Sequence, residues 1–186
     1  MGIGAAADWS SDLASVLLTK EAIQARVAEL ARQIAADYEG KNPLVVGVLK
    51  GSVVFLSDLM REMGIPLEVD LVCVSSYGQS AESCGEITIL KDLTAEVQGR
   101  HVLLVEDILD SGMTICHLAA LLRQREPASL RICALLSKPT RRQVECEADY
   151  LGFEIPDEFV VGYGLDYAER FHWLPYVAVL KPESYR

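Results

Sequence analysis

Three carboxylates lie within five positions of one another in the stretch VLLVEDILDSGMT, residues 102–114. They belong to Glu106, Asp107 and Asp110, and they follow a run of residues that looks buried. Because like charges at this spacing repel each other, a cation or strong hydrogen-bond donors should share the site. The stretch is therefore the first place to expect chemistry.

The turn after the carboxylates suits a phosphate group. Gly112 stands between Ser111 and Thr114 where a helix is expected to begin, and the free N–H groups and positive dipole end of such a turn attract an anion. Carboxylates cannot bind phosphate directly, but they accept hydrogen bonds from sugar hydroxyls and attract hydrated Mg²⁺. A ribose phosphate would match both the turn and the carboxylates before it.

Strands and amphipathic helices are predicted to alternate along the chain. Ile23, Val27, Leu30 and Ile34 lie on one face of a helix expected from about Thr19 to about Tyr38. Two more helices are expected, over 54–63 and from about 113 to a stop at Pro127, and the expected strands are 44–49, 67–76, 86–90, 101–106 and 130–136. This order predicts an α/β fold with a parallel sheet flanked by helices, whose ligands bind at the carboxyl ends of the strands.

Composition limits the function classes. A chain of 186 residues with 51% hydrophobic content predicts one domain over residues 1–186, with residues 1–14 as a loosely held tail. The net charge of −10 disfavours nucleic-acid or membrane partners. Five cysteines without C-x-x-C spacing, no signal peptide, and apolar runs too short for a membrane span favour the cytoplasm.

Five motifs in order resemble a known family. VLLVEDILDSGMT resembles the phosphoribosyl pyrophosphate signature of the type I phosphoribosyltransferases, and with VGVLKGS, SSYG, LLSKP and PDEFVVGYGLDYAE the chain resembles the hypoxanthine-guanine branch of that family from about Leu17 onward. The resemblance implies a small hood, formed by the C-terminal strands and the N-terminal segment, over the sheet. It also implies Mg²⁺ as cofactor, small-molecule substrates and a homodimer or homotetramer.

The resemblance implies that a purine base displaces pyrophosphate from C1 of 5-phosphoribosyl pyrophosphate. The residues implied to bind the phosphoribosyl group are Glu106, Asp107, Asp110, Ser111, Gly112, Met113 and Thr114. Asp110 would also be catalytic, as the general base at N7 of the purine. An isolated Asp-Ser-Gly could instead be a turn in which the Asp caps a helix.

Other motifs imply the base-binding and metal-binding residues. Lys138 would donate to O6 of hypoxanthine or guanine, which the amino group of adenine cannot replace as an acceptor. Phe159 would stack on the purine, the backbone of Val160 would bond its edge, and Asp166 would bind near the base and hold a Mg²⁺ shared with pyrophosphate. Glu106 and Asp107 complete the implied metal ligands. Without the resemblance, Lys138 could be an ordinary surface lysine, Phe159 a core residue and Asp166 a structural residue of a turn.

The pyrophosphate side is implied to contain Lys50, Gly51, Ser76, Tyr77 and His172, with a cis peptide between Leu49 and Lys50. Ser76 and Tyr77 stand at the base of a candidate lid, residues 77–85, that would exclude water.

His172 departs from the family, which usually has arginine there. Imidazole is mostly neutral at pH 7.5, whereas guanidinium is always charged. We therefore expect weak pyrophosphate binding that tightens below about pH 6.5. His172 could instead turn away and pack beside Trp173, and Arg170 could replace the missing charge if the backbone allows it.

Two other classes share parts of the pattern. VLLVED and LLSKP also resemble a signalling receiver domain. However, Asp110 is the only aspartate between Asp107 and Lys138, so no phospho-acceptor aspartate ends an intermediate strand. A non-catalytic regulator of the same fold would bind nucleic acid, which the acidic composition disfavours.

Overall fold

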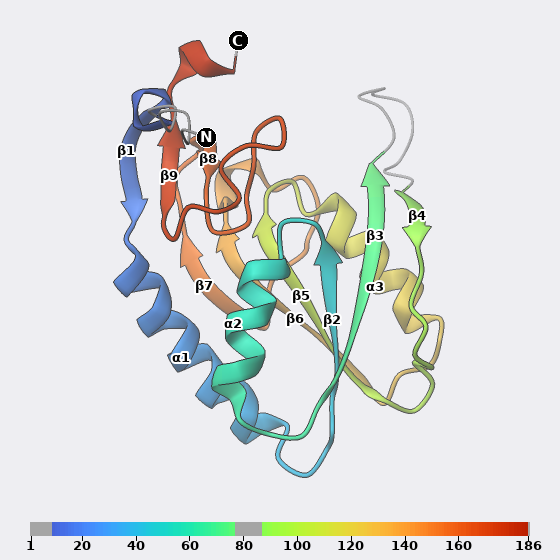
Figure 1. The fold of residues 1–186 in the computed structure, drawn as a ribbon. Coiled ribbons are helices and arrows are strands. Elements are labelled where there is room, and N and C mark those ends of the chain that lie inside the picture. The colour runs from blue at the N-terminus through green and yellow to red at the C-terminus, as the bar shows by residue number, and fades with distance from the viewer. Residues whose placement is uncertain (1–8, 77–86, 186) are drawn as a thin grey trace, which may run out of the picture.

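A six-stranded sheet forms the centre of the computed structural model, which describes residues 9–76 and 87–185 (Figure 1). Its strand order is β4-β3-β2-β5-β6-β7, and only β4 runs antiparallel to its neighbour. The strands are β2 (Leu44–Leu49), β3 (Glu68–Ser76), β4 (Ile87–Lys91), β5 (His101–Leu109), β6 (Ser129–Ser137) and β7 (Tyr150–Glu154). The predicted α/β fold is confirmed.

Helices cover both faces of this sheet. The helices α1 (Lys20–Asp37) and α2 (Val53–Met63) pack on one face, and α3 (Met113–Arg123) packs on the other (Figure 1). Because side chains alternate along a strand, Val45 and Leu103 face the first pair of helices while Val46 and Leu104 face α3. No helix in the part of the chain that the structure describes is long and apolar enough to cross a membrane.

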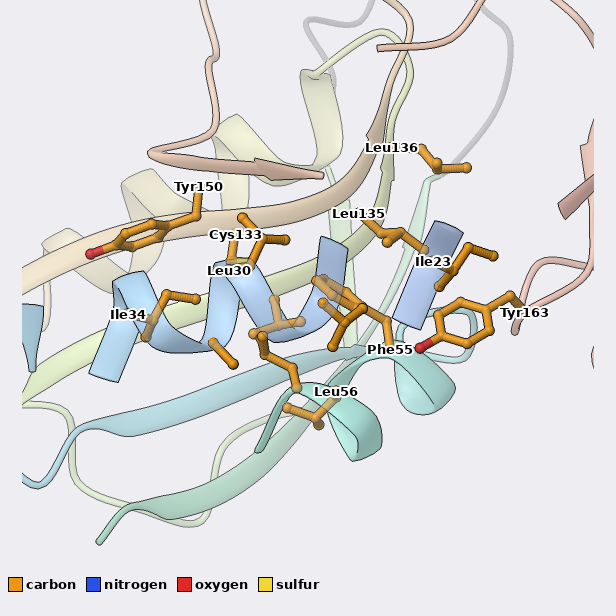
Figure 2. Close-up of a cluster of buried hydrophobic side chains, with 14 of the residues drawn as sticks. Ile23, Leu30, Ile34, Phe55, Leu56, Cys133, Leu135, Leu136, Tyr150 and Tyr163 are labelled. Atoms are coloured by element: carbon orange, nitrogen blue, oxygen red, sulfur yellow. The ribbon is translucent and has the colours of Figure 1, made fainter. Parts of the chain in front are cut away.

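The largest of the three apolar clusters among the described residues joins α1 and α2 to the strands. Figure 2 shows Ile23, Leu30 and Ile34 on one side of α1 together with Phe55 and Leu56 of α2. The predicted periodicity of α1 is confirmed, and its start is fixed by Thr19, whose hydroxyl accepts a hydrogen bond from the Ala22 N–H at 3.2 Å.

A second, smaller sheet forms the hood. Its order is β1-β9-β8, with β1 (Leu13–Leu18), β8 (Val160–Val161) and β9 (Val177–Leu180) all antiparallel (Figure 1). Leu13 already pairs with Leu180, and the short helix η1 (Trp9–Asp12) precedes it. The expected loose tail of residues 1–14 is thus wrong at its later end, because this pairing holds it; residues 1–8 lie outside the described part.

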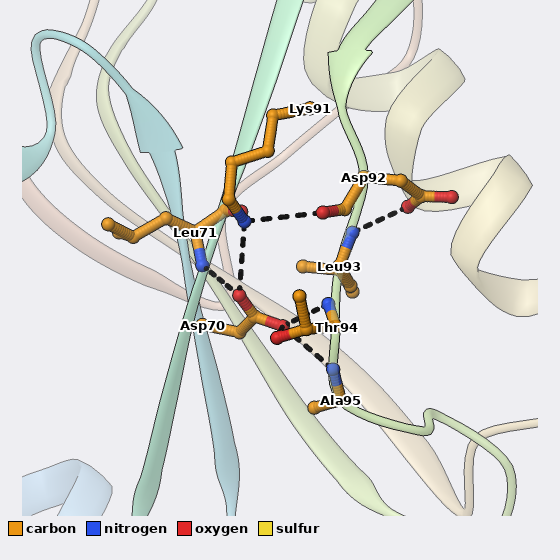
Figure 3. A network of polar contacts seen from close by, with 7 residues as sticks. All are labelled: Asp70, Leu71, Lys91, Asp92, Leu93, Thr94 and Ala95. Atoms are coloured by element: carbon orange, nitrogen blue, oxygen red, sulfur yellow. Dashed lines mark hydrogen bonds and ion pairs between the residues drawn. The ribbon is translucent and has the colours of Figure 1, made fainter.

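The edge of the main sheet is fastened by a buried aspartate. Asp70 in β3 accepts hydrogen bonds from the N–H groups of Leu71, Thr94 and Ala95 at 2.6–2.9 Å, and Lys91 lies 3.4 Å away (Figure 3). Burial by itself would raise the pKa of Asp70, but these donors outweigh it and hold the pKa well below its usual range. The network fixes the segment after β4 against β3.

Strand β5 is three residues longer than predicted. Its pairing with β6 continues through Ile108 and Leu109, opposite Leu136 and Ser137. Asp107 therefore lies inside the strand rather than in the turn after it, because the hydrogen-bonded ladder with β6 continues beyond the apolar run.

Candidate active site

The carboxyl ends of β2, β5 and β6 meet at one edge of the sheet, as expected for parallel strands. Leu109 at the end of β5 lies opposite Ser137 at the end of β6. The Lys138 N–H donates to the Leu109 carbonyl at 2.9 Å. This register brings Lys138 next to Asp110, although the two are far apart in sequence.

A small cavity lies at the turn that was expected to bind phosphate. It has a volume of about 140 Å³ and is lined by Glu106, Ile108, Leu109, Asp110, Ser111, Gly112, Thr114 and Ile115. Gly112 has a φ of +82°, a conformation that favours glycine, and directly precedes α3. Ser111 accepts a hydrogen bond from the N–H of Met113, whose side chain is exposed. The residues that were expected to bind the sugar and the phosphate therefore line one cavity.

The two carboxylates in β5 differ in environment. Burial, and then the negative charge of Asp107, raise the pKa of Glu106 well above its usual range. Glu106 Oε2 is buried and has no hydrogen-bond partner among the described residues. Asp107 accepts a hydrogen bond from the Ile108 N–H at 2.9 Å. Glu106 thus offers an unsatisfied acceptor to a ligand.

This pair fits a magnesium ion that is bound jointly with substrate. Among the described residues, no three acidic, histidine or cysteine side chains cluster closely enough to hold a metal alone. Mg²⁺ commonly takes one or two protein carboxylates and completes its shell with water and phosphate oxygens. The unsatisfied Glu106 oxygen and the adjacent Asp107 meet that requirement.

Asp110 is held by two arginines that follow Lys138. Arg141 Nε lies 2.7 Å from Asp110 Oδ1, as an ion pair rather than an aligned hydrogen bond, since that oxygen has no hydrogen-bond donor among the described residues. Arg142 donates to the Asp110 carbonyl at 3.2 Å and to Ser137 Oγ at 2.8 Å. The side chain of Arg142 also packs against Gly112 and so supports the turn of residues 110–114.

Lys138 follows β6 and Phe159 precedes β8, and both differ from the alternatives that the sequence allowed. Lys138 is only 6% exposed, and its ammonium lies 3.9 Å from Asp157, which Arg141 also contacts at 3.4 Å. Lys138 is therefore not the ordinary surface lysine of the alternative reading. Phe159 is 37% exposed and so is not a core residue either, whereas Val160 is buried in β8.

The Lys50–Gly51 turn packs tightly between two other parts of the chain. A side chain at Gly51 would overlap Asp107, and one at Gly164 would overlap the carbonyl of Gly51. The Leu49–Lys50 peptide is cis, as the resemblance implied. The proposed leaving-group side is thereby joined to the carboxylate pair.

His172 lies on this side of the site. Its Nδ1 is 2.8 Å from the Gly164 carbonyl, and its Nε2 is 3.6 Å from Glu169 and 4.0 Å from Asp166. It therefore belongs to a charged group with Lys50 and does not simply pack beside Trp173, which is largely exposed.

At the pyrophosphate side, the expected residues Ser76 and Tyr77 stand at the limit of the described residues, and Arg170 has another partner. Ser76 is the last residue of β3, and Tyr77 and the candidate lid lie outside the described residues. Arg170, which could have replaced the missing arginine, pairs with Asp12 of the N-terminal segment and lies over the ring of Phe171.

Sequence reasoning missed Arg141, Arg142, Asp157 and Glu169. The consecutive arginines just after Lys138 were a usable signal, because a strand end that carries ligand-binding residues often continues into the site. No local pattern marks Glu169, since its partner Lys50 is 119 positions away.

Comparisons with known proteins show the family to which the chain belongs. Residues 14–168 match the phosphoribosyl transferase domain family. The chain is 49% identical to a hypoxanthine-guanine phosphoribosyltransferase of Bacillus subtilis, over 94% of this chain and 97% of that protein. A hypoxanthine phosphoribosyltransferase structure from Staphylococcus aureus is 46% identical, with a TM-score of 0.93 and full coverage of both chains.

Some relatives are longer. The chain is 50% identical to the bifunctional protein TilS/HprT of Listeria monocytogenes over 98% of its own length, but it spans 28% of that protein.

Proposed function

Because the chain belongs to the hypoxanthine-guanine phosphoribosyltransferase family, we propose that it transfers the 5-phosphoribosyl group of phosphoribosyl pyrophosphate to N9 of hypoxanthine or guanine. The products would be IMP or GMP and pyrophosphate. One observation carries the proposal: the cavity lined by both Glu106 and Asp110 also contains Leu109, whose carbonyl accepts a hydrogen bond from the backbone N–H of the buried residue Lys138.

The ribosyl substrate would bind in the cavity at the start of α3. Its 5′-phosphate would accept hydrogen bonds from backbone N–H groups of the turn formed by Ser111, Gly112, Met113 and Thr114. Its ribose hydroxyls would donate to Glu106 and Asp107, which satisfies the buried acceptor on Glu106. Both contacts would hold C1 in place for the incoming base.

The purine would lie between this cavity and the hood. Lys138 would donate to O6, and its three N–H donors without an acceptor would disfavour the amino group of adenine. Phe159 would stack on the ring, and the Val160 backbone would bond its edge. Asp110 would accept the N7 proton as charge develops on the base, with Arg141 keeping the carboxylate in place.

The leaving group would bind at Lys50, Gly51 and His172, with Ser76 and Tyr77 closing over it. Asp166 lies beside His172 and would hold one Mg²⁺, while Glu106 and Asp107 would hold another at the ribose. Bound there, Mg²⁺ would neutralise charge on the pyrophosphate. Residues that surround C1 would exclude water and so protect it from hydrolysis.

A panel of bases tests the proposal directly. Purified protein with Mg²⁺ and phosphoribosyl pyrophosphate should convert hypoxanthine and guanine to their monophosphates, and removal of Mg²⁺ with a chelator should stop the reaction. Adenine should remain unconverted. Equal turnover of adenine would contradict the role of Lys138, and no turnover of any purine would contradict the activity.

Assembly and compartment are part of the proposal. A homodimer or homotetramer in the cytoplasm, acting on small-molecule substrates, fits the family and the unpaired cysteines of the described residues, Cys73, Cys116, Cys133 and Cys146.

A further inference from the structure

Three aromatic rings from separate segments meet at the candidate base site. Phe159 precedes β8, Tyr167 follows it, and Tyr185 comes after β9. The rings of Phe159 and Tyr185 are stacked, with centroids 4.7 Å apart and planes 20° apart. Tyr167 meets Phe159 edge-on at 5.6 Å and meets Tyr185 at 6.5 Å. Phe159 is thus part of a packed cluster and not a single ring on a surface.

The segment that carries Tyr185 is fixed to the hood at several points. The Leu180 N–H donates to the carbonyl of Phe159 at 2.8 Å, and the Lys181 N–H donates to the carbonyl of Asp12 at 2.9 Å. The Ser184 hydroxyl donates to the Asp12 carboxylate at 3.2 Å. The position of Tyr185 is therefore set by hydrogen bonds from the residues that directly precede it.

The stack leaves part of Phe159 accessible. A phenyl ring has two faces, and Tyr185 covers one of them while Tyr167 contacts the ring edge-on. Phe159 nevertheless keeps 37% of its surface exposed. Because Tyr185 occupies one face, a flat heterocycle that stacks on Phe159 would have to use the opposite face.

We propose that Tyr185 is a positioning residue for the purine: it packs behind Phe159 and holds that ring in the plane that the base requires. This inference rests on the proposed function, because it takes Phe159 as the ring on which the base stacks. Without Tyr185, the Phe159 ring would gain freedom that base binding must then remove. The loss should affect base binding and leave the turn of residues 110–114 unchanged, because none of the three rings lines the cavity there.

The size of the effect follows from ring stacking. Removal of one parallel aromatic contact should raise KM for hypoxanthine roughly 3- to 10-fold. KM for phosphoribosyl pyrophosphate should stay within about twofold, because none of the three rings lines the cavity beside Asp110. Tyr185→Phe keeps the ring and should behave as wild type.

Four variants test the inference: Tyr185→Ala, Tyr185→Phe, Phe159→Ala and the double variant Tyr185→Ala/Phe159→Ala. Each is measured for KM of hypoxanthine, KM of phosphoribosyl pyrophosphate and melting temperature. Tyr185→Leu, which keeps apolar bulk, replaces Tyr185→Ala if the latter fails to fold. We expect Tyr185→Ala to raise only KM of the base and to add nothing further in the Phe159→Ala background.

Each other result overturns the inference in a recognisable way. An unchanged base KM in Tyr185→Ala, with a raised one in Phe159→Ala, rejects the role of Tyr185 and leaves the proposed function standing. Equal increases in both KM values would mean general damage to the fold. A lower base KM would mean that Tyr185 covers the face that the base needs. If Phe159→Ala has no effect, base stacking itself fails.

Discussion

Lys50 and Glu169 form an ion pair, with 2.7 Å between Lys50 Nζ and Glu169 Oε1. The pairing raises the pKa of Lys50 and lowers that of Glu169, mainly through the hydrogen bond between them. Both side chains are well exposed, so the pair can open at little cost. Glu169 therefore holds the ammonium that the leaving group is proposed to need.

Removal of the Glu169 charge should strengthen pyrophosphate binding. In Glu169→Gln, the anion no longer displaces a carboxylate from Lys50, and affinity should rise about 2- to 5-fold, the range of an exposed ion pair. The gain should shrink at high salt because exposed charges are screened. Isothermal titration with magnesium pyrophosphate at two ionic strengths measures it.

The control for this prediction is Glu62→Gln, which removes the same charge from an exposed position on α2. It reports the effect of net charge alone and should change affinity little. Equal gains in both variants would show that long-range charge, and not the Lys50 contact, governs binding of the anion.

Asp110→Asn should lower kcat by roughly 10²-fold or more, since an amide cannot accept the N7 proton. KM for phosphoribosyl pyrophosphate should change less, because the turn binds phosphate through its backbone. Asp157→Asn is the matched control: it removes the other carboxylate on Arg141 and should leave kcat nearly intact. Steady-state kinetics decide, and a near-normal kcat in Asp110→Asn would reject the base role.

The existence of buried strands and the apolar faces of helices were predictable, because both are recorded in the local sequence. The helix face of Ile23 through Ile34 and the strand at 44–49 can be recognised from residues a few positions apart. The structure confirms both. The extension of β5 to Leu109 was not predictable in this way, since it depends on a partner strand at 129–137. The place of Leu13 in a strand likewise depends on pairing with Leu180.

In the candidate site, too, the features written in one continuous motif were predictable, and the contacts between separate segments were not. The phosphate turn is one continuous motif, so the spacing of its residues predicted a shared cavity, which the structure contains. The contacts that hold the functional groups were not predictable: Arg141 with Asp110, Glu169 with Lys50 and Tyr185 with Phe159. Each joins different loops, and their meeting is decided by tertiary packing.

Asp70→Asn should destabilise the protein in a pH-dependent way. The folded-state pKa of Asp70 lies below the unfolded value near 3.9, so its stabilisation is present above about pH 4 and is lost as pH falls further. We expect a loss of about 2 kcal/mol in the free energy of unfolding at pH 7, with a smaller difference at pH 3. Urea denaturation at both values measures it, and a constant difference would refute the depressed pKa.

His172→Arg should strengthen pyrophosphate binding, but only modestly on its own. A guanidinium offers a permanent charge and two parallel donors, whereas imidazole is charged mainly in acid. The gain should therefore be larger at pH 8.5 than at pH 6. However, Glu169 and Asp166 lie within 3.6 and 4.0 Å of the present ring, and they would compete for the new charge.

The double variant His172→Arg/Glu169→Gln separates attraction of the anion from competition by these carboxylates. If Glu169 captures the new arginine, the double variant should gain more than the product of the two single gains, because residues in one ion-pair network are not additive. Titration with pyrophosphate at pH 6, 7.5 and 8.5 gives the three comparisons. Affinity that stays flat with pH in the parent and unchanged in both arginine variants would place His172 outside the pyrophosphate site, leaving Lys50 and Mg²⁺ as the charges on the leaving group.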